Sequence, residues 1–380
     1  MKIFITTIRT LVGILFIFSG LVKANDPLGL SYKIQEFFDV WKVYFLNKYT
    51  LSFSIAIISF EIVAGIAVLL GWQKKIFLWC ILLLTLFFAF LTGYAVFSNK
   101  IKTCGCFGDC IPLTAQQSFI KDLILLALVL LLLAYKRYLS PLFKAFISML
   151  VVIITLASSL FFQWYVLRHL PIVDCLPYKK GNHLPTLMQP PLGSVSDSSV
   201  ITFVYTKNGK EIEFTANQFP QDFNDRVYHF KKRYDKLIRK GNAEPVIQDF
   251  SLNSSISGVD STNEILRYSG NTLILFVENI DDNSLWINDI KELYDLLNRR
   301  SGWLFIIASN NTKQVLDLIS QKIHVQIPLF NCDATVIKTI ARANPTLYLL
   351  QKGFVINKWS YVDFNEAIKN IKTSIRKNSY

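Results

Sequence analysis

Five apolar stretches of roughly bilayer-spanning length lie within the first 165 residues of this chain of 380 residues. A transmembrane helix needs about 20 consecutive, mostly apolar residues. The stretches are Thr10 to Lys23, Leu51 to Gly71, Ile76 to Phe97, Phe119 to Tyr135 and Phe143 to Tyr165. The first could be taken for a signal peptide, but no cleavage site of small residues follows it closely, so an uncleaved helix is expected. The sequence therefore predicts a multi-pass α-helical membrane bundle of about five spans over residues 1–165.

The charges of the chain are divided unevenly between its two halves. Of the net charge of +13, residues 1–170 contribute +9, since they hold 15 basic and 6 acidic residues. The short loops at one end of the predicted bundle are purely basic and contain Lys2, Arg9, Lys74, Lys75, Lys136, Arg137 and Lys144. The positive-inside rule places this end in the cytoplasm, and an odd number of spans then places everything after residue 165 in the periplasm. The basic excess therefore reflects the orientation of the chain in a bacterial inner membrane. It predicts the lipid bilayer, and not nucleic acid, as a partner.

The segment Leu30 to Phe45 mixes aromatic and charged residues, in the order LSYKIQEFFDVWKVYF. One interpretation is a helix that lies in the outer membrane interface, with its rings at the depth of the headgroups. The other interpretation is a short soluble helix that caps the bundle. The sequence leaves both open.

Residues 166–245 have the composition of an exported stalk. Prolines and glycines are dense between residues 166 and 198, which predicts a linker. Two runs of alternating residues then flank Asn208-Gly209, a dipeptide typical of tight β-hairpins. The basic stretch from about Val227 to Lys240 predicts a helix that leads into the last domain.

Strand and helix patterns alternate over residues 246–380. The runs IQDFSL, TLILFVE and WLFIIAS predict strands, and helical spacing follows the last two of them. A hairpin across Lys352-Gly353 and a closing helix from Asp363 complete the pattern. The sequence therefore predicts an exported α/β domain.

The order of these elements resembles that of thioredoxin-like domains, most closely at Asn344-Pro345-Thr346. The resemblance implies a cis proline beside the active site, a place that Pro345 holds. A thioredoxin also carries Cys-x-x-Cys after its central strand, whereas residues 277–286 of this chain contain no cysteine. Since thiol–disulfide exchange needs a thiolate, this domain is expected to dock a periplasmic client protein rather than to oxidise it.

Three cysteines, Cys104, Cys106 and Cys110, lie close together in the loop between the third and fourth predicted spans. They are interpreted as a redox-active thiol set, as one structural disulfide plus a spare thiol, or as part of a metal site. Cys-x-Cys-x₃-Cys is not a standard zinc spacing and a fourth ligand is not evident, so no metal is predicted. Cys110 could resolve a disulfide between the other two, and Cys175 is another candidate partner thiol.

Glu61 lies midway along the second predicted span. A carboxylate at this depth is costly and usually faces the bundle interior beside a partner. It is a candidate functional carboxylate, either as a proton relay or as a group that orients a ligand such as a quinone. The structural alternative is a hydrogen bond between helices, for which Ser19 is a candidate, and Gly20 and Gly65 would allow the two helices to approach closely.

The loop sequence CGCFGDC resembles the Cys-Gly-Cys-Phe-Gly signature of MauE-type proteins, which are related to DoxX. The first span with FIFSGLVKANDPLG, and Glu61 with Gly65 and LLGW in the second span, extend the resemblance to DoxX-like proteins. It implies a redox-associated accessory or maturation factor on the periplasmic side, and the family label implies methylamine metabolism. An enzyme of this kind would be at most a membrane thiol–disulfide or quinone-linked oxidoreductase. The alternative is a non-enzymatic membrane scaffold with structural cysteines and a degenerate thioredoxin-like binding domain.

Overall fold

The computed structural model describes residues 1–98, 100–101, 105, 107–239, 241–279, 286–298, 302–309 and 312–377. Two compact units make up the chain. The larger consists of Met1–Gly181 together with Ser251–Tyr380, and the smaller of Asn182–Phe250. Residues 166–181, which the composition assigns to a stalk, therefore belong to the larger unit.

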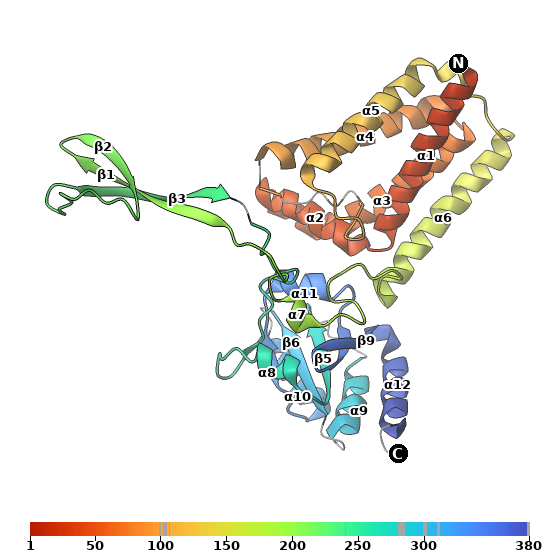
Figure 1. Cartoon of the computed structure of the whole chain (residues 1–380). Helices are drawn as coiled ribbons and strands as arrows, with labels where there is room; N and C mark the ends of the chain where they lie inside the picture. Colours follow the sequence, from red (N-terminus) through yellow and green to blue (C-terminus); the bar gives the residue numbers. More distant parts are fainter. Residues whose placement is uncertain are drawn as a thin grey trace. The chain divides into compact units, whose positions relative to one another are not determined.

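In the described part of the larger unit, five helices are long and apolar enough to cross a membrane, as the sequence predicts (Figure 1). They are α1 (Lys2–Ala24), α3 (Thr50–Leu70) with the preceding 3-10 turn η1 (Tyr44–Tyr49), α4 (Lys74–Ser98), α5 (Ala115–Ala134) and α6 (Ala145–His169). Helix α1 packs against α3, α4 packs against α5, and α6 packs on α3. The multi-pass bundle is therefore confirmed.

Small residues bring α1 and α3 together. A Cβ atom added to Gly65 would lie 3.0 Å from the carbonyl oxygen of Gly13 and 2.9 Å from the side chain of Ile17. A Cβ atom on Gly20 would lie 2.5 Å from the side chain of Ile62. The close approach expected from Gly20 and Gly65 is therefore present, and it lets side chains of the two helices meet directly.

The basic loops meet at one end of the bundle. The guanidinium of Arg9 donates to the carbonyl of Ser140 at 2.8 Å, and the ammonium of Lys74 donates to the carbonyl of Leu139 at 2.5 Å. These contacts join α1, the start of α4, and the link between α5 and α6, which contains the 3-10 turn η2 (Lys136–Tyr138). Arg9 and Lys74 thus lie at the same end of the bundle, and the side of the membrane that this end faces stays a prediction.

The helix expected after the first span is α2 (Pro27–Val40), which begins and ends a few residues earlier than expected. Pro27 occupies its first turn, and the carboxylate of Asp26 caps it by accepting from the amide of Gly29 at 3.0 Å. Helix α2 packs on α3, where the hydroxyl of Ser54 donates to the carbonyl of Pro27 at 2.7 Å. Helix α2 therefore packs against the bundle, and the two interpretations of this segment, an interfacial helix and a soluble cap, both stay open.

The smaller unit is a three-stranded antiparallel sheet in the order β2-β1-β3, preceded by the short helix α7 (Leu184–Leu187). Its strands are β1 (Ser198–Lys207), β2 (Lys210–Thr215) and β3 (His229–Arg239). Asn208 and Gly209 both have positive φ angles, 52° and 78°, as a tight hairpin turn requires. The expected hairpin is therefore confirmed.

The helix expected over residues 227–240 is wrong, because residues 229–239 form strand β3. Strand β3 pairs with the edge of β1 that β2 leaves open. A two-stranded hairpin is marginal alone, so the third strand supplies the missing partner. The ring of Phe230 lies 5.5 Å from that of Tyr205 on the neighbouring strand. Pairing with β1 thus overrides the helical spacing of the basic residues.

The C-terminal part of the larger unit is a six-stranded mixed sheet in the order β4-β7-β6-β5-β8-β9. The strands are β4 (Asn253–Ser254), β5 (Asn271–Val277), β6 (Trp303–Ala308), β7 (Leu329–Asn331), β8 (Thr346–Gln351) and β9 (Phe354–Ser360). Strands β5, β6 and β7 are parallel, and β8 and β9 form the expected antiparallel hairpin. The strand expected at IQDFSL is wrong, because the only strand near it is β4, which follows it and has two residues.

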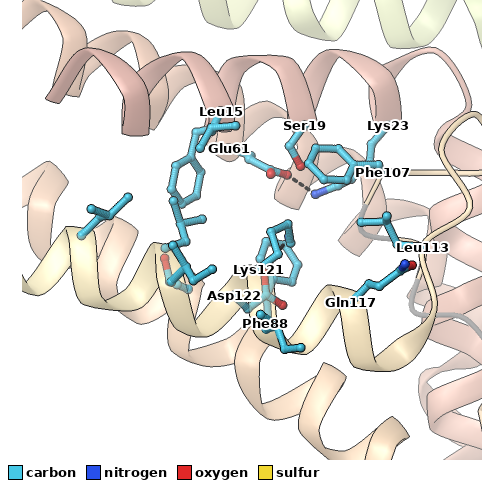
Figure 2. Close-up of a pocket in the computed structure, with 16 residues that line it drawn as sticks. Leu15, Ser19, Lys23, Glu61, Phe88, Phe107, Leu113, Gln117, Lys121 and Asp122 are labelled. Atoms are coloured by element: carbon cyan, nitrogen blue, oxygen red, sulfur yellow. Dashed lines mark hydrogen bonds and ion pairs between the residues drawn. The ribbon is translucent and has the colours of Figure 1, made fainter. Parts of the chain in front are cut away.

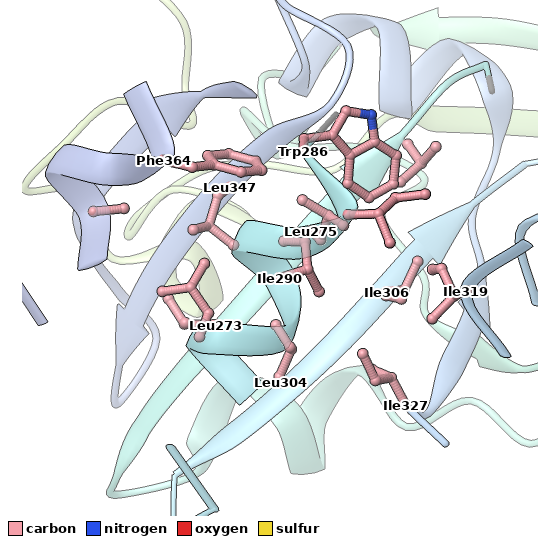
Figure 3. Close-up of a cluster of buried hydrophobic side chains, with 14 of the residues drawn as sticks. Leu273, Leu275, Trp286, Ile290, Leu304, Ile306, Ile319, Ile327, Leu347 and Phe364 are labelled. Carbon is pink, nitrogen blue, oxygen red and sulfur yellow. The ribbon is translucent and has the colours of Figure 1, made fainter. Parts of the chain in front are cut away.

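Helices cover both faces of this sheet: α8 (Thr262–Arg267), α9 (Ile287–Asn298), α10 (Thr312–Ile323), α11 (Ala334–Ile340) and α12 (Phe364–Lys377), the last after the 3-10 turn η3 (Tyr361–Asp363). Figure 3 shows Leu273 and Leu275 of β5 facing Ile290 of α9 in one buried cluster. The alternate residue Phe276 lies on the opposite face, with its ring 5.2 Å from that of Tyr348. The α/β prediction is confirmed, with buried strands between two helical layers.

Candidate functional site

A cavity of about 510 Å³ opens in the membrane bundle between helices α1, α3, α4 and α5 (Figure 2). Its walls are mostly apolar, with polar groups at a few points. The lining residues are Leu15, Phe16, Ser19, Lys23, Glu61, Thr85, Phe88, Phe107, Leu113, Gln117, Ile120, Lys121, Asp122, Ile124, Leu125 and Leu128. Its volume lies within the range of about 300–1,000 Å³ typical of sites for small molecules.

Lys23 and Glu61 form a buried ion pair on the wall of this cavity. The Lys23 Nζ lies 2.5 Å from the Glu61 Oε2, and the two side chains are 2% and 3% exposed. Lys23 stands in the last turn of α1 and Glu61 in the middle of α3, so the close packing of these helices brings them together. The ammonium also lies 4.6 Å from the centre of the Phe88 ring, which favours the cation.

The sequence indicates Glu61 but not Lys23, which stands there only as the last residue of the first predicted span. The signal for it was the carboxylate itself, since a charge at membrane depth needs a partner of opposite charge. The pair is separated by 38 residues, so no local pattern marks it. Ser19, the candidate partner from sequence, lines the same cavity.

A second polar pair stands on the opposite wall, on α5. Asp122 is buried, with its side chain 1% exposed, and its Oδ1 lies 2.7 Å from the Nζ of Lys121. The hydroxyl of Thr92 on α4 donates to the other oxygen of Asp122 at 3.1 Å. Sequence analysis did not single out Asp122, although an aspartate inside an apolar span is itself a functional signal. The cavity therefore offers two polar anchors between apolar walls.

The cysteine loop reaches this cavity through Phe107. The Phe107 ring lies 5.9 Å from that of Phe18 on α1, and the Nζ of Lys121 lies 5.0 Å from its centre. Gly105 lines a second, small cavity that also contacts Lys23. Cys104 and Cys106 lie outside the described residues. Their described neighbours Gly105 and Phe107, however, each line a cavity that Lys23 also lines.

Cys110 and Cys175 form a disulfide, with their Cα atoms 4.8 Å apart. The bond joins the loop before α5 to the segment after α6, across 65 residues of sequence. Cys110 is therefore not a free thiol in this structure, and the role of resolving thiol that the sequence suggested for it does not apply to this state.

Two other cysteines in the described part of the chain are free, Cys80 on α4 and Cys332 after β7. Burial raises the pKa of the Cys332 thiol to about 11. A thiol with this pKa stays protonated at neutral pH and is a poor nucleophile. Cys332 thus packs as a small apolar group. Within the described ranges, no group of three or more His, Cys, Asp and Glu side chains is arranged to hold a metal ion.

The peptide bond between Asn344 and Pro345 is cis. The Asn344 side chain accepts from the amides of Glu278 and Asn279 at 2.9 and 3.3 Å. These contacts hold the proline loop against the end of β5, the place where a thioredoxin-like domain carries its two cysteines. Residues 280–285, which follow, lie outside the described part of the chain.

Comparisons with known proteins concern mainly the membrane part of the chain. Residues 1–135 match the family described as methylamine utilisation protein MauE. Residues 199–240, which cover the three-stranded sheet, match a domain of unknown function, DUF8463. Protein TlpB of Flavobacterium psychrophilum is 33% identical over 130 residues, which are 33% of this chain and 35% of the relative. The chain thus spans about a third of the length of the curated relative that it matches. No solved structure matches the chain.

The matched stretch contains the groups that build the cavity. Lys23, Glu61 and Asp122 lie within it, and so does the loop that carries Cys104, Cys106 and Cys110. Over residues 1–135, which hold four of the five long apolar helices, this chain therefore matches the MauE family.

Proposed function

We propose that this chain is a redox-associated accessory protein of the bacterial inner membrane that acts on the periplasmic side. Cys104 and Cys106 exchange electrons with a client dithiol, and a lipid-soluble quinone in the bundle cavity takes them up. The observation that carries the proposal is that Phe107, next to Cys106 in the chain, lines the cavity that holds the Lys23–Glu61 pair. A thiol loop and a site for an apolar carrier are thereby adjacent.

The chemistry of the cavity walls suits a quinone. Leu15, Leu125 and Leu128 offer apolar surface to an isoprenoid chain. Lys23 and Lys121 offer ammonium donors to the two carbonyl oxygens of a quinone ring. Because a charged donor in an apolar site stabilises developing negative charge, these lysines would favour reduction of the ring.

The proposed reaction has two steps, oxidation of the client by the loop disulfide and reduction of the quinone by the loop thiols. A client thiolate attacks a Cys104–Cys106 disulfide, and the second client thiolate resolves the mixed disulfide, which leaves an oxidised client and two loop thiols. The two thiols then pass two electrons and two protons to the quinone, which becomes a quinol, and the loop disulfide forms again. Lys23 and Glu61 provide a proton donor and a proton acceptor on the cavity wall.

The placement of the charges supports the proposed side of action. Arg9 and Lys74 contact the link between α5 and α6 at one end of the bundle, and a basic end faces the cytoplasm by the positive-inside rule. The loop that follows α4 then opens to the periplasm, together with the α/β domain. An oxidising compartment is where a disulfide such as Cys110–Cys175 persists.

Thiol trapping in membranes tests the proposal. In the Cys106→Ser variant, the Cys104 thiolate should attack the disulfide of an oxidised client and remain joined to it, because the loop thiol that would resolve the mixed disulfide is absent. The mixed disulfide is detected by mass spectrometry after acid quenching and alkylation. Cys80→Ser, in the first half of α4, is the matched control and should behave as the unmodified protein. If neither Cys104→Ser nor Cys106→Ser changes the client's oxidation state, the proposal is wrong.

A second candidate function is a non-enzymatic scaffold. It is favoured by the Cys110–Cys175 bond, which ties together two segments that flank α5 and α6 in the manner of a structural staple. The scaffold predicts a stable, stoichiometric complex that is crosslinked through the α/β domain. It also predicts no mixed disulfide in the trapping experiment, so the same measurement separates the two functions.

A further inference from the structure

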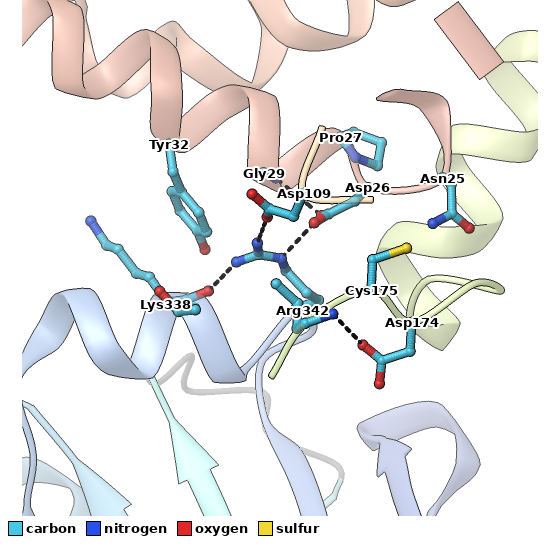
Figure 4. Close-up of polar contacts among 12 residues, drawn as sticks. Asn25, Asp26, Pro27, Gly29, Tyr32, Asp109, Asp174, Cys175, Lys338 and Arg342 are labelled. Atoms are coloured by element: carbon cyan, nitrogen blue, oxygen red, sulfur yellow. Dashed lines mark hydrogen bonds and ion pairs between the residues drawn. The ribbon is translucent and has the colours of Figure 1, made fainter. Parts of the chain in front are cut away.

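Arg342, which follows α11, is held by two carboxylates from the membrane part of the chain (Figure 4). Its Nε donates to the Oδ2 of Asp26, and its Nη2 donates to the Oδ2 of Asp109, both at 2.8 Å. Its Nη1 donates to the carbonyl of Lys338 at 2.6 Å. The guanidinium thereby joins the α/β domain to the start of α2 and to the cysteine loop.

The Arg342 side chain is 4% exposed, so its charge depends on these carboxylates. Burial alone would lower the pKa of Arg342, but Asp26 and Asp109 outweigh it, and the pKa is raised. An ion pair that is taken out of water is costly to break on one side only, because the remaining charge is left without a partner. Arg342 is therefore a fixed anchor while both carboxylates stay in place.

A second ion pair joins the same two parts of the chain. Lys358 on β9 contacts Asp174 in the segment after α6, and their side chains are 9% and 18% exposed. Burial lowers the pKa of Lys358, and Asp174 offsets this only in part. The α/β domain is thus bound at two basic residues, Arg342 and Lys358.

Two of the three acidic partners of these bases lie at the same position relative to a cysteine. Asp109 immediately precedes Cys110, and Asp174 immediately precedes Cys175. Because Cys110 and Cys175 are bonded to each other, the disulfide fixes both carboxylates as one acidic surface. Without the bond, the Asp174 segment would keep the hydrogen bonds between Val173 and the Asn25 side chain but lose its direct covalent link to the Asp109 segment.

Helix α2 covers the edge of the α/β domain beside this anchor. The hydroxyl of Tyr32 donates to Glu278, just after β5, at 3.4 Å, and Lys338 donates to Gln35 at 3.3 Å. The backbone amide of Glu278 also donates to the Asn344 side chain, so α2 lies next to the cis-proline loop. The surface expected to dock a client is therefore occupied by the chain's own bundle.

We infer that the Cys110–Cys175 disulfide is a redox-sensitive clasp for this docking surface. In the oxidised state it holds Asp109 and Asp174 against Arg342 and Lys358, and the cis-proline edge stays covered. Reduction separates Asp109 from Asp174, weakens the ion pairs that these two carboxylates form with Arg342 and Lys358, and uncovers that edge for a partner protein. The inference extends the proposed function but uses a different cysteine pair.

The opening reaction is a thiol–disulfide exchange with a dithiol. One thiolate of the dithiol attacks a sulfur of the Cys110–Cys175 bond, and its second thiolate resolves the mixed disulfide. Two electrons pass to the chain, which gains two thiols, and the dithiol becomes a disulfide. Both cysteines are partly exposed, so a small dithiol can reach them.

Hydrogen–deuterium exchange of the full chain in lipid nanodiscs tests the clasp. The chain carries Cys104→Ser and Cys106→Ser, so that the result does not depend on the proposed electron transfer. Dithiothreitol should raise exchange in peptides over residues 334–345 at least about tenfold, since a crosslink across a long loop removes much of the opening entropy. Peptides over β5 and β6 should not change, which separates undocking from unfolding.

Two further variants complete the test. A Cys110→Ala, Cys175→Ala chain should show the raised exchange without dithiothreitol and no further change with it. Asp109→Asn should raise exchange in the same peptides while the disulfide remains intact. If mass spectrometry shows the disulfide fully reduced and exchange over residues 334–345 is unchanged, the inference is overturned. It is equally overturned if β5 and β6 exchange rises together with that of residues 334–345.

Discussion

The Nζ of Lys23 lies 2.5 Å from the Oε2 of Glu61, and this ion pair joins the end of α1 to the middle of α3 inside a membrane bundle. Neither side chain has more than 3% of its surface exposed. The pair stands on the wall of a cavity that also contacts Phe107 of the cysteine loop. The stability of the bundle and the proposed redox chemistry therefore both depend on Lys23 and Glu61.

Replacement of Glu61 by Gln should destabilise the bundle. The change leaves the Lys23 ammonium buried without a counter-charge, a loss of about 3–5 kcal/mol for a broken buried pair. Thermal unfolding of the detergent-solubilised protein should show a clearly lower midpoint. The double variant Lys23→Met, Glu61→Leu should recover much of the stability, but it should not oxidise the client, because both charged groups of the cavity wall are absent. A Glu61→Gln protein as stable as the unmodified chain would show that the pair does not hold the helices.

Replacement of Gly65 by Ala should separate α1 from α3. The new methyl would lie 3.0 Å from the carbonyl oxygen of Gly13, a backbone atom that cannot move away easily. Overpacking of this kind costs about 1–3 kcal/mol. The matched control is Gly93→Ala on α4, where the methyl meets the edge of the Phe119 ring at 3.1 Å. Unfolding midpoints of the two variants should differ, with Gly65→Ala the lower; equal midpoints would contradict the packing.

Replacement of Leu125 by Trp should fill the cavity and block the carrier. Leu125 lines the cavity on α5, whereas Leu130 on the same helix is 50% exposed and does not line it. Photolabelling with an azido-quinone in proteoliposomes should fall at least about tenfold for Leu125→Trp, since a bulky ring removes the space that the ligand needs. Leu130→Trp is the control and should label as the unmodified chain does. Equal labelling of both variants would place the quinone elsewhere.

The stability of the α/β domain should decrease between pH 9 and pH 11 because of Cys332. Burial raises the pKa of this thiol from its ordinary value of 9.0 to about 11 in the folded state. Between these values the folded thiol keeps its proton and the unfolded thiol releases it, so stability is lost as the pH rises. At about 1.4 kcal/mol for each pH unit, the loss approaches about 3 kcal/mol.

Urea unfolding followed by tryptophan fluorescence checks this pH dependence. The difference between the unmodified chain and Cys332→Ala isolates the thiol from the other groups that titrate in this range. The unmodified chain should lose more stability than Cys332→Ala as the pH rises from 9. If both lose the same amount, Cys332 does not titrate with the stated shift.

The membrane bundle could be predicted closely from the sequence, because a long apolar run has few alternatives to a helix in a bilayer. The hairpin at Asn208-Gly209 was also predictable, since only a few residue types accept positive φ angles there. Strand β3 could not be predicted, because its conformation depends on pairing with β1 and not on its own spacing.

The partners in the polar contacts of the sites could mostly not be predicted from the sequence. Glu61 was recognisable in the sequence as a carboxylate in an apolar span. Its contact with Lys23, however, is formed by the packing of two helices and could not be recognised there. The contact between Arg342 and Asp26 joins residues 316 positions apart, and no pattern in either segment reveals it. Such pairs depend on the tertiary fold, so a single sequence shows that a partner is needed without showing which residue it is.

The most direct test of the central claim is quinol formation in anaerobic proteoliposomes that contain the chain, a quinone and a reduced dithiol peptide. One quinol should form for each peptide disulfide, measured by ultraviolet absorbance and mass spectrometry. Cys104→Ser or Cys106→Ser should abolish both products, while Cys80→Ser should leave them unchanged. Quinol formation that persists in Cys104→Ser, or peptide oxidation without quinol, would contradict the account.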